Sequence, residues 1–252
     1  MASTVIQAFN ELNLNSSNKM KNISSLGEFI DGTFLISEMN RVAKFSVTRY
    51  NLLKKAHSTE YKSQLAANMN IPTDTNFNVE IGIINKRTMM RTYPTNDPFY
   101  KNSSSNLDMA VETAIYPWEE IAIYHESADG KWLFGEIFNS YGWVPVESVS
   151  FAPREEINRL IKSPEFVVIT ADKVTIEGMQ LDMGMKLPYV SETENSYTVL
   201  LPNDGTTLTT KEAQIQKSVS NKGYLPFSTA NMIKQALKFY GEVYGWGGLK
   251  NT

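Results

Sequence analysis

The spacing of apolar residues divides the chain into a helical first part and a β-rich remainder. Several apolar positions recur at the three- and four-residue intervals of one helix face. They are Leu35, Met39 and Val42, then Leu52 with Ala56, and Leu65 with Met69. Pro72 ends the pattern, because proline disfavours helix at the residue before it. We therefore expect residues 1–76 to form a helical N-terminal segment.

From about residue 77 the period shortens to two, which is typical of strands. The alternating positions are Val79, Ile81 and Ile83, then Ile121 and Ile123, and then the two faces of 132–137, followed by 141–144. Asp129-Gly130 is a two-residue hairpin signal, because both residues tolerate positive φ. Short strands joined by tight turns predict a small β barrel over 77–152. Trp132 and Trp143 are expected in its core.

Two further stretches frame this barrel. Residues 94–107 are rich in Pro, Asn, Asp and Ser, which predicts a long polar loop reaching over the barrel mouth. Residues 155–162 look helical, and strand candidates follow at 166–169, 174–176, 189 and 197–201, with turns at Gly178, Gly184 and 203–205. We therefore expect a second small barrel over 153–222.

The last segment, 223–252, combines a helix with a glycine-rich stretch. Ser228 or Thr229 can cap a helix whose apolar positions are Met232, Ile233, Ala236, Leu237 and Tyr240. After it comes the sequence Tyr-Gly-Trp-Gly-Gly at 244–248. An apolar helix face normally needs a partner to cover it, so we expect this helix to open a further domain. The whole chain is then of the α+β class.

Composition excludes several functions. Hydrophobic residues make up 42% of the 252 positions, enough for a packed core, and the formal net charge of −3 disfavours a nucleic-acid partner. No apolar run has the length of a transmembrane helix. The sequence has no cysteine, and its histidines, His57 and His125, stand far apart in unrelated contexts. We expect no metal site and no cofactor.

Several short motifs resemble those of a known protein family. The stretches 223–229 and 244–248 resemble the opening of the catalytic domain in NlpC-type papain-like cell-wall peptidases. Other stretches are similar to the bacterial SH3-like domains of the multi-domain members: 87–95, 125–132 and 142–144 for the first domain, and 183–188 for the second. The resemblance covers nearly the whole chain. It implies a stabilising N-terminal segment, two SH3-like barrels and the start of a papain-like domain.

The activity implied by this resemblance is that of a γ-D-glutamyl-diamino-acid endopeptidase acting on murein stem peptides. In the family, an Asp-Cys-Ser motif with the nucleophile follows the Tyr-x-Trp-Gly-Gly motif, and a histidine comes later. This sequence contains no cysteine, so no thiolate and no acyl-enzyme can form, and no catalytic residue is assigned. The resemblance therefore implies a non-catalytic front part that serves substrate recognition and wall targeting, with the catalytic domain as an absent partner.

Candidate binding residues come from the same resemblance and from local pattern. They are Tyr244, Trp246, Gly247, Tyr116, Trp118 and Glu112. The tail residues would line the substrate cleft, the two aromatic residues would frame a peptide, and a carboxylate would pair with a free amine. Each assignment has a competing interpretation. The tail residues could be exposed, Trp118 could pack in the barrel, and Glu112 could be a solvated charge, as could Asp108 and Glu119. Arg87 and Arg91 either hold an acidic group or form a solvated strand edge.

A second function stays open beside the first. The chain is also compatible with a stand-alone SH3-like module that binds a peptide or peptidoglycan and has no enzymatic role. Either function predicts an extracytoplasmic location, in the cell wall, the periplasm or the medium. Residues 1–15 lack the charged and apolar regions of an export signal.

Overall fold

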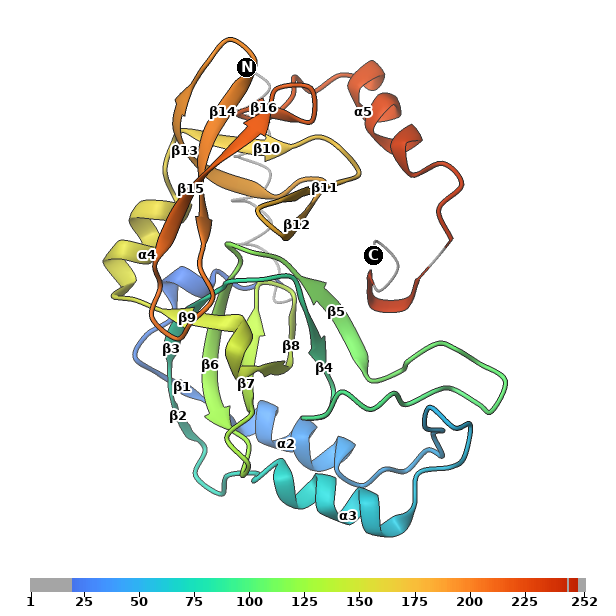
Figure 1. The fold of residues 1–252 in the computed structure, drawn as a ribbon. Helices are drawn as coiled ribbons and strands as arrows, with labels where there is room; N and C mark the ends of the chain where they lie inside the picture. The colour runs from blue at the N-terminus through green and yellow to red at the C-terminus, as the bar shows by residue number, and fades with distance from the viewer. Residues whose placement is uncertain (1–19, 244, 249–252) are drawn as a thin grey trace.

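A computed structural model describes residues 20–243 and 245–248. A helical segment lies at one end, a seven-stranded sheet in the middle and a second β unit at the other end, as Figure 1 shows. The predicted α+β class is confirmed in broad terms, with strands dominant. The positions of the domain boundaries remain predictions.

The N-terminal segment contains two of the predicted helices. Its elements are η1 (Ile23–Ser25), β1 (Phe29–Asp31), α2 (Thr33–Val42), α3 (Thr59–Asn68) and β2 (Asn76–Asn78), with β1 and β2 paired. The helical prediction at Leu52 and Ala56 is wrong. The Asn51 side chain accepts the backbone N–H groups of Leu53 and Lys55 and so holds a turn in place of a helix. Residues 1–19 lie outside the described part of the chain.

The central sheet is antiparallel throughout. Its strand order is β5 (Val111–Ile115), β4 (Thr88–Arg91), β8 (Ser140–Pro145), β7 (Trp132–Ile137), β6 (Glu120–Glu126), β3 (Glu80–Ile84) and β9 (Val149–Phe151), the last preceded by η2 (Val146–Ser148). All seven strands contribute to one apolar cluster that includes Met90, Ile115 and Val149. A sheet whose two edge strands share one core is curled, as the predicted small barrel requires.

The alternation along β7 is confirmed, and both of its faces are buried. Leu133 and Ile137 belong to the inner cluster. Trp132 and Phe134 point the other way and join a larger core. That core also contains Trp143 and residues of the N-terminal segment, which packs against the outside of the sheet (Figure 1). The predicted core positions of Trp132 and Trp143 are thereby confirmed.

The predicted hairpin between β6 and β7 is present, but its loop is longer than a two-residue turn. Ser127 still pairs with Trp132, through an N–H to carbonyl bond of 2.9 Å, so residues 128–131 form the loop. Gly130 has a φ of +67°, as the turn demands. Asp129 accepts hydrogen bonds from the Ser127 hydroxyl and the Lys131 N–H, which hold the longer loop in shape.

The second β unit has more strands than the sequence pattern predicts. After α4 (Arg154–Ile161), the sheet order is β15 (Thr210–Gln216), β14 (Ser196–Pro202), β13 (Lys186–Glu192), β10 (Phe166–Ile169) and β16 (Ser220–Lys222). A separate hairpin joins β11 (Lys173–Ile176) to β12 (Met179–Asp182). The sequence pattern missed β12, β15 and β16, because these strands contain few apolar residues, and β12 and β16 bury the polar side chains of Asp182 and Ser220. The description of this unit as an SH3-like barrel stays a prediction.

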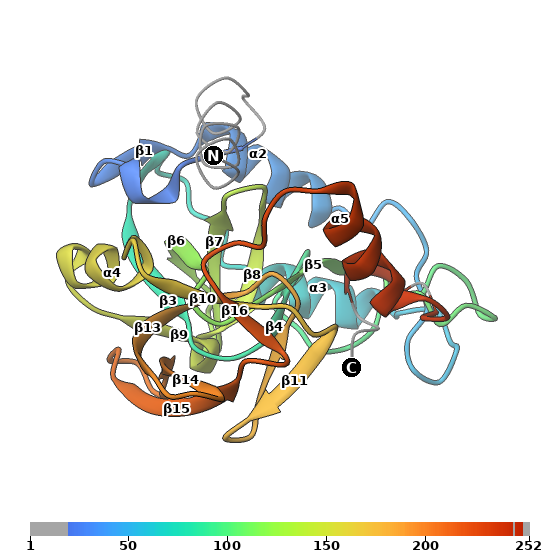
Figure 2. The same ribbon diagram turned by 90° about the horizontal axis from the view of Figure 1, so that it is seen from above.

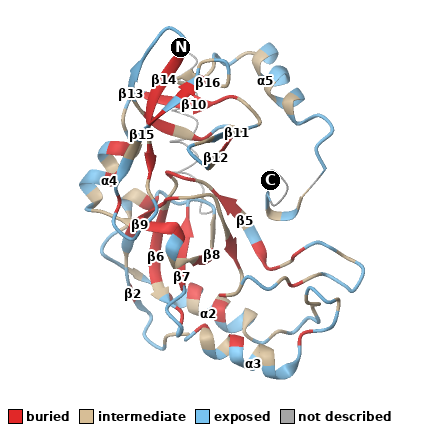
Figure 3. Ribbon diagram, viewed as in Figure 1, coloured by how far each residue is buried: buried red, intermediate tan, exposed pale blue. Residues whose placement is uncertain are grey.

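The C-terminal helix is present and carries an uncovered apolar surface. It comprises α5 (Thr229–Ala236) and the turn η3 (Leu237–Phe239), and the Ser228 side chain caps it by accepting the Asn231 N–H. No residue of α5 is buried, as the colours of Figure 3 show. The helix lies on the opposite side of the second unit from α4 (Figures 1 and 2).

Candidate substrate-recognition site

The glycine-rich tail is seated on the edge strand of the central sheet. In η4 (Trp246–Gly248) the Trp246 Nε1–H donates to the Val111 carbonyl of β5 at 2.9 Å. Gly247 has a φ of +60°, and a Cβ there would lie 2.5 Å from the Val111 Cγ1. Gly248 has a φ of +76°, and a Cβ there would lie 3.0 Å from the Ala114 Cβ. Only glycine permits both this conformation and this approach. Tyr244, the first residue of the motif, lies outside the described residues.

One arginine connects this tail to both β units. The Arg87 Nη2 donates to the Gly248 carbonyl at 2.8 Å, and its Nε lies 3.0 Å from an Asp182 carboxylate oxygen. The two side chains are only 11% and 5% exposed. Because water screens such a pair poorly, breaking it leaves an uncompensated charge. Arg87 therefore fixes the tail, the central sheet and β12 to one another, and its predicted position on a solvated edge is wrong.

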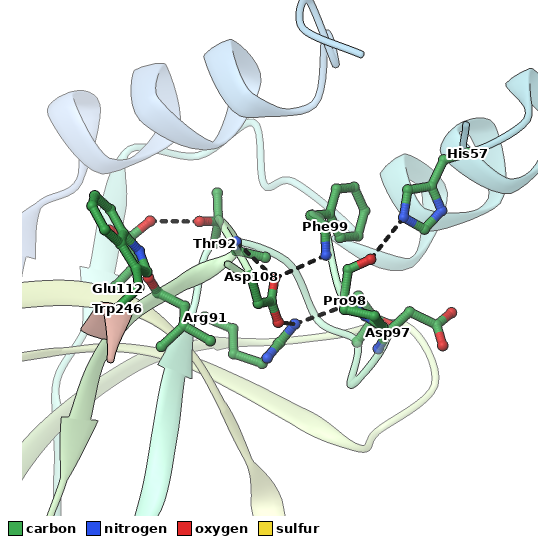
Figure 4. A network of polar contacts seen from close by, with 12 residues as sticks. His57, Arg91, Thr92, Asp97, Pro98, Phe99, Asp108, Glu112 and Trp246 are labelled. Atoms are coloured by element: carbon green, nitrogen blue, oxygen red, sulfur yellow. Dashed lines mark hydrogen bonds and ion pairs between the residues drawn. The ribbon is translucent and has the colours of Figure 1, made fainter. Parts of the chain in front are cut away.

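Glu112 lies on β5 directly beside the tail contact, as Figure 4 shows. It is exposed, and it accepts a hydrogen bond from the Thr92 hydroxyl at 2.5 Å. A cavity of about 180 Å³ adjoins it, between β5, β8 and α2. On its far wall Tyr141 donates to Glu38, and burial raises the pKa of Tyr141 to about 12. Glu112 is thus a carboxylate at the mouth of a hollow, open to a cationic ligand group.

Tyr116 stands where β5 ends. Its ring is half-buried, the Arg87 guanidinium lies 5.8 Å from the ring centroid, and burial is the main cause that raises the pKa of its hydroxyl. With Asp182, Phe239 and Gly248 it lines a cavity of about 260 Å³. The structure therefore brings Tyr116, Glu112 and the tail together along one strand and its end.

Trp118 lies apart from this surface. It is 6% exposed, and its Nε1–H donates to the Leu200 carbonyl of the second unit at 3.0 Å. Its backbone has a φ of +71°, with Pro117 before it and a Glu119 N–H to Tyr116 carbonyl bond across the turn. This is the pattern of a type II turn with tryptophan where glycine is usual. Its geometry matches the packing interpretation of Trp118.

The 94–107 loop is held by the N-terminal segment. Tyr50 and Tyr100 exchange two backbone hydrogen bonds, and His57 Nε2 lies 3.0 Å from the Pro98 carbonyl. At its base Arg91 pairs with Asp108 at 2.9 Å, and the same carboxylate accepts the Phe99 N–H (Figure 4). Arg91 and Asp108 are both buried, so predicting them as solvated charges is wrong. The pairing joins residues 17 positions apart, which no local pattern reveals.

Within residues 20–243 and 245–248, no group of three His, Asp or Glu side chains is placed to hold a metal ion. In the same part of the chain, none of the helices is both long enough and apolar enough to span a bilayer.

Comparison with known proteins agrees with this architecture. Residues 96–145, from the polar loop to the end of β8, match the family model of the SH3 domain of SH3b1 type. A solved NlpC/P60 endopeptidase from Photobacterium damselae subsp. piscicida is similar over 99% of this chain, with a TM-score of 0.73 and 20% identity. An NlpC/P60 family protein from Bacillus cereus ATCC 10987 is similar over 68%, with a TM-score of 0.53 and 20% identity. No curated protein matches the sequence.

Residues 96–145 are thus similar to an SH3 domain, and the fold of the chain is similar to that of part of the solved NlpC/P60 proteins. The resemblance to NlpC-type peptidases with SH3-like domains is thereby confirmed. The chain spans 59% of the Photobacterium protein and 67% of the Bacillus protein.

Proposed function

We propose that this chain is the non-catalytic, substrate-recognising part of a murein endopeptidase that cleaves γ-D-glutamyl-diamino-acid bonds. One observation carries the proposal. The motif that resembles the start of a papain-like peptidase domain is seated on β5, beside Glu112 and near Tyr116. A catalytic domain that continues from this motif would place its cleft against the same strand. The SH3 domain would then form one wall of the substrate site.

The chemistry of that wall suits the free end of a stem peptide. Glu112 is an exposed carboxylate, and an ammonium group is its natural charged partner. Tyr116 offers a half-buried ring with a polar tip, which can lie against a peptide while its hydroxyl bonds to it. Together they would select a peptide with an uncapped amine over one that is still joined to a glycan strand.

Hydrolysis itself needs a nucleophile from elsewhere. The 252 residues contain no cysteine, so the thiolate chemistry of the family cannot be carried out by them. The uncovered apolar positions of α5 and η3, including Met232, Ile233 and Leu237, are where a catalytic domain would pack. We place the protein outside the cytoplasm, because its proposed substrate is part of the wall.

Calorimetric titration with the tripeptide L-Ala-γ-D-Glu-diamino acid tests the proposal. The chain should bind the free-amine tripeptide, and the N-acetylated tripeptide should bind about tenfold more weakly or worse, because a charge-assisted hydrogen bond is lost. Glu112→Gln should reduce binding of the free-amine form to the level of the acetylated one. Glu212→Gln, an exposed carboxylate of the second unit, is the matched control. Mass spectrometry of the same samples should show no cleavage.

Other results would redirect the conclusion. Cleavage by this cysteine-free chain would refute the non-catalytic role. Equal binding of the two tripeptides would show that Glu112 does not recognise the free amine. Binding to intact peptidoglycan but to neither tripeptide would favour the alternative, a stand-alone SH3-like wall-binding module.

A further inference from the structure

A third cavity lies between the two β units and shares Tyr116 with the cavity beside the tail. Its volume is about 270 Å³. Its walls are the 116–119 turn of the first unit, the end of α4, the start of β10 and residues 184–188. These segments meet only in the folded chain, and Leu160 and Ile161 at the end of α4 form part of the wall. Cavities at such junctions are common positions for small-molecule sites.

One wall carries a carboxylate without a cation. Glu119 accepts the backbone N–H of Tyr116 at 3.2 Å. Among the described residues, no lysine or arginine lies within ion-pairing distance of it. Burial raises the pKa of Glu119 to about 7, with only that backbone hydrogen bond opposing the shift. The carboxylate is therefore desolvated and largely uncompensated, which is energetically unfavourable without a ligand.

Another wall carries a cation without an anion. The Lys186 Nζ lies 4.4 Å from the centroid of the Phe166 ring, and burial lowers its pKa. No carboxylate in the described part of the chain pairs with it. Two other lysines of this unit behave differently, since Lys217 and Lys222 both form ion pairs. Lys186 is thus a partly buried cation over an aromatic face, and it lines the same cavity as Glu119.

We propose that this cavity binds a small zwitterion, a free amino acid or a short peptide, with its ammonium group at Glu119 and its carboxylate at Lys186. The ammonium group of such a ligand would pair with the Glu119 carboxylate, and its carboxylate would pair with the Lys186 ammonium, for which the described residues provide no ion-pair partner. Apolar lining from Phe166 and Pro188 suits the body of the molecule between its two ends. The site shares Tyr116 with the surface beside the tail but does not include Glu112, and its existence does not rest on the proposed function.

The backbone of the carboxylate wall is held in an uncommon conformation. Trp118 keeps a positive φ of 71°, and its side chain is anchored by the bond to the Leu200 carbonyl. Non-glycine residues in this region carry strain that the surrounding structure must offset. The anchored turn fixes the backbone of Glu119, which follows directly. The cavity wall is accordingly formed before a ligand arrives, as a binding site requires.

Titration calorimetry with alanine, dialanine, N-acetyl-dialanine and dialanine amide tests the site. Dialanine or alanine should bind, and the acetylated and amidated forms should each bind about tenfold more weakly or worse, because each loses one charged contact. The first two ligands distinguish an amino-acid site from a peptide site. Glu119→Gln should weaken binding of the dialanine amide, which keeps the ammonium, and Lys186→Met should weaken binding of N-acetyl-dialanine.

Matched controls separate the site from the rest of the molecule. Glu120→Gln changes the neighbouring carboxylate, which accepts a hydrogen bond from Ser24 and does not line this cavity. Lys222→Met removes an ion-paired lysine of the same unit. Both should leave dialanine binding unchanged. Thermal melts of each variant verify folding, and backbone NMR shifts at Lys186 and Phe166 locate the ligand.

Three results would overturn the proposal. One is the absence of binding by alanine and dialanine at millimolar concentration. Another is equal binding of the free and both capped dipeptides, since neither charge would then be recognised. The third is unchanged binding by folded Glu119→Gln and Lys186→Met variants. None of these results bears on Glu112, so failure here and failure of the proposed function are distinguishable.

Discussion

Replacing Glu119 by glutamine should stabilise the protein at alkaline pH. Glutamine keeps the shape of the side chain and an oxygen that can accept the Tyr116 N–H, so the bond at 3.2 Å can persist. It removes the charge that burial disfavours. The perturbation is therefore confined to the ionisation of one carboxyl group at the junction of the two β units.

The magnitude follows from the two pKa values of this group. Its ordinary pKa is 4.5, and in the folded chain the pKa is about 7. The folded state keeps the proton longer than the unfolded state, so stability falls as the pH rises from 4.5 towards 7. At 1.36 kcal/mol for each pKa unit, the ionised group lowers the free energy of unfolding by about 3 kcal/mol. Most of this loss falls between pH 5 and 8.

Urea denaturation of wild type and Glu119→Gln at pH 5 and at pH 8 measures the effect. The variant should exceed the wild type by about 3 kcal/mol at pH 8 and by little at pH 5. Other groups also titrate in this range. Burial raises the pKa of Glu120 and lowers that of His125, but both are common to the two proteins and cancel in the difference. An equal difference at both pH values would refute the reasoning.

Two further variants test the seating of the tail. Gly247→Ala would place a Cβ 2.5 Å from the Val111 Cγ1, so amide hydrogen exchange in β5 should accelerate. Gly241 also has a positive φ but has open space around it, so Gly241→Ala should leave hydrogen exchange in β5 unchanged. Exchange rates that match in the two variants would contradict the close fit. Arg87→Met would leave Asp182 buried without its cation and should lower the free energy of unfolding by about 3–5 kcal/mol in urea melts. A loss below about 1 kcal/mol would show that water reaches the carboxylate.

Helices, strands, turns and contiguous motifs could be predicted from the sequence, because each depends on a short stretch of residues. The period of 3.6 predicted α2 and α5, and the period of two predicted β6 and β7, because these patterns record which side of an element is buried. Turn glycines such as Gly130 and Gly184 adopt positive φ, which is a local property of the backbone. The Tyr-Gly-Trp-Gly-Gly motif pointed to the family for the same reason: its residues are contiguous.

Features that depend on distant contacts were decided by tertiary structure alone. Arg87 lies just before β4 and Arg91 at its end, yet each pairs with a different buried carboxylate, one of them 95 residues away. The sequence leaves Trp118 open between framing a peptide and packing in the barrel, and only the folded chain shows its bond to the Leu200 carbonyl of the other β unit. Glu119 has an ordinary sequence context, and its raised pKa follows only from burial in the folded chain. The burial, ion-pair partners and pKa of a side chain depend on the groups that surround it in space, and the order of residues along the chain does not reveal these groups.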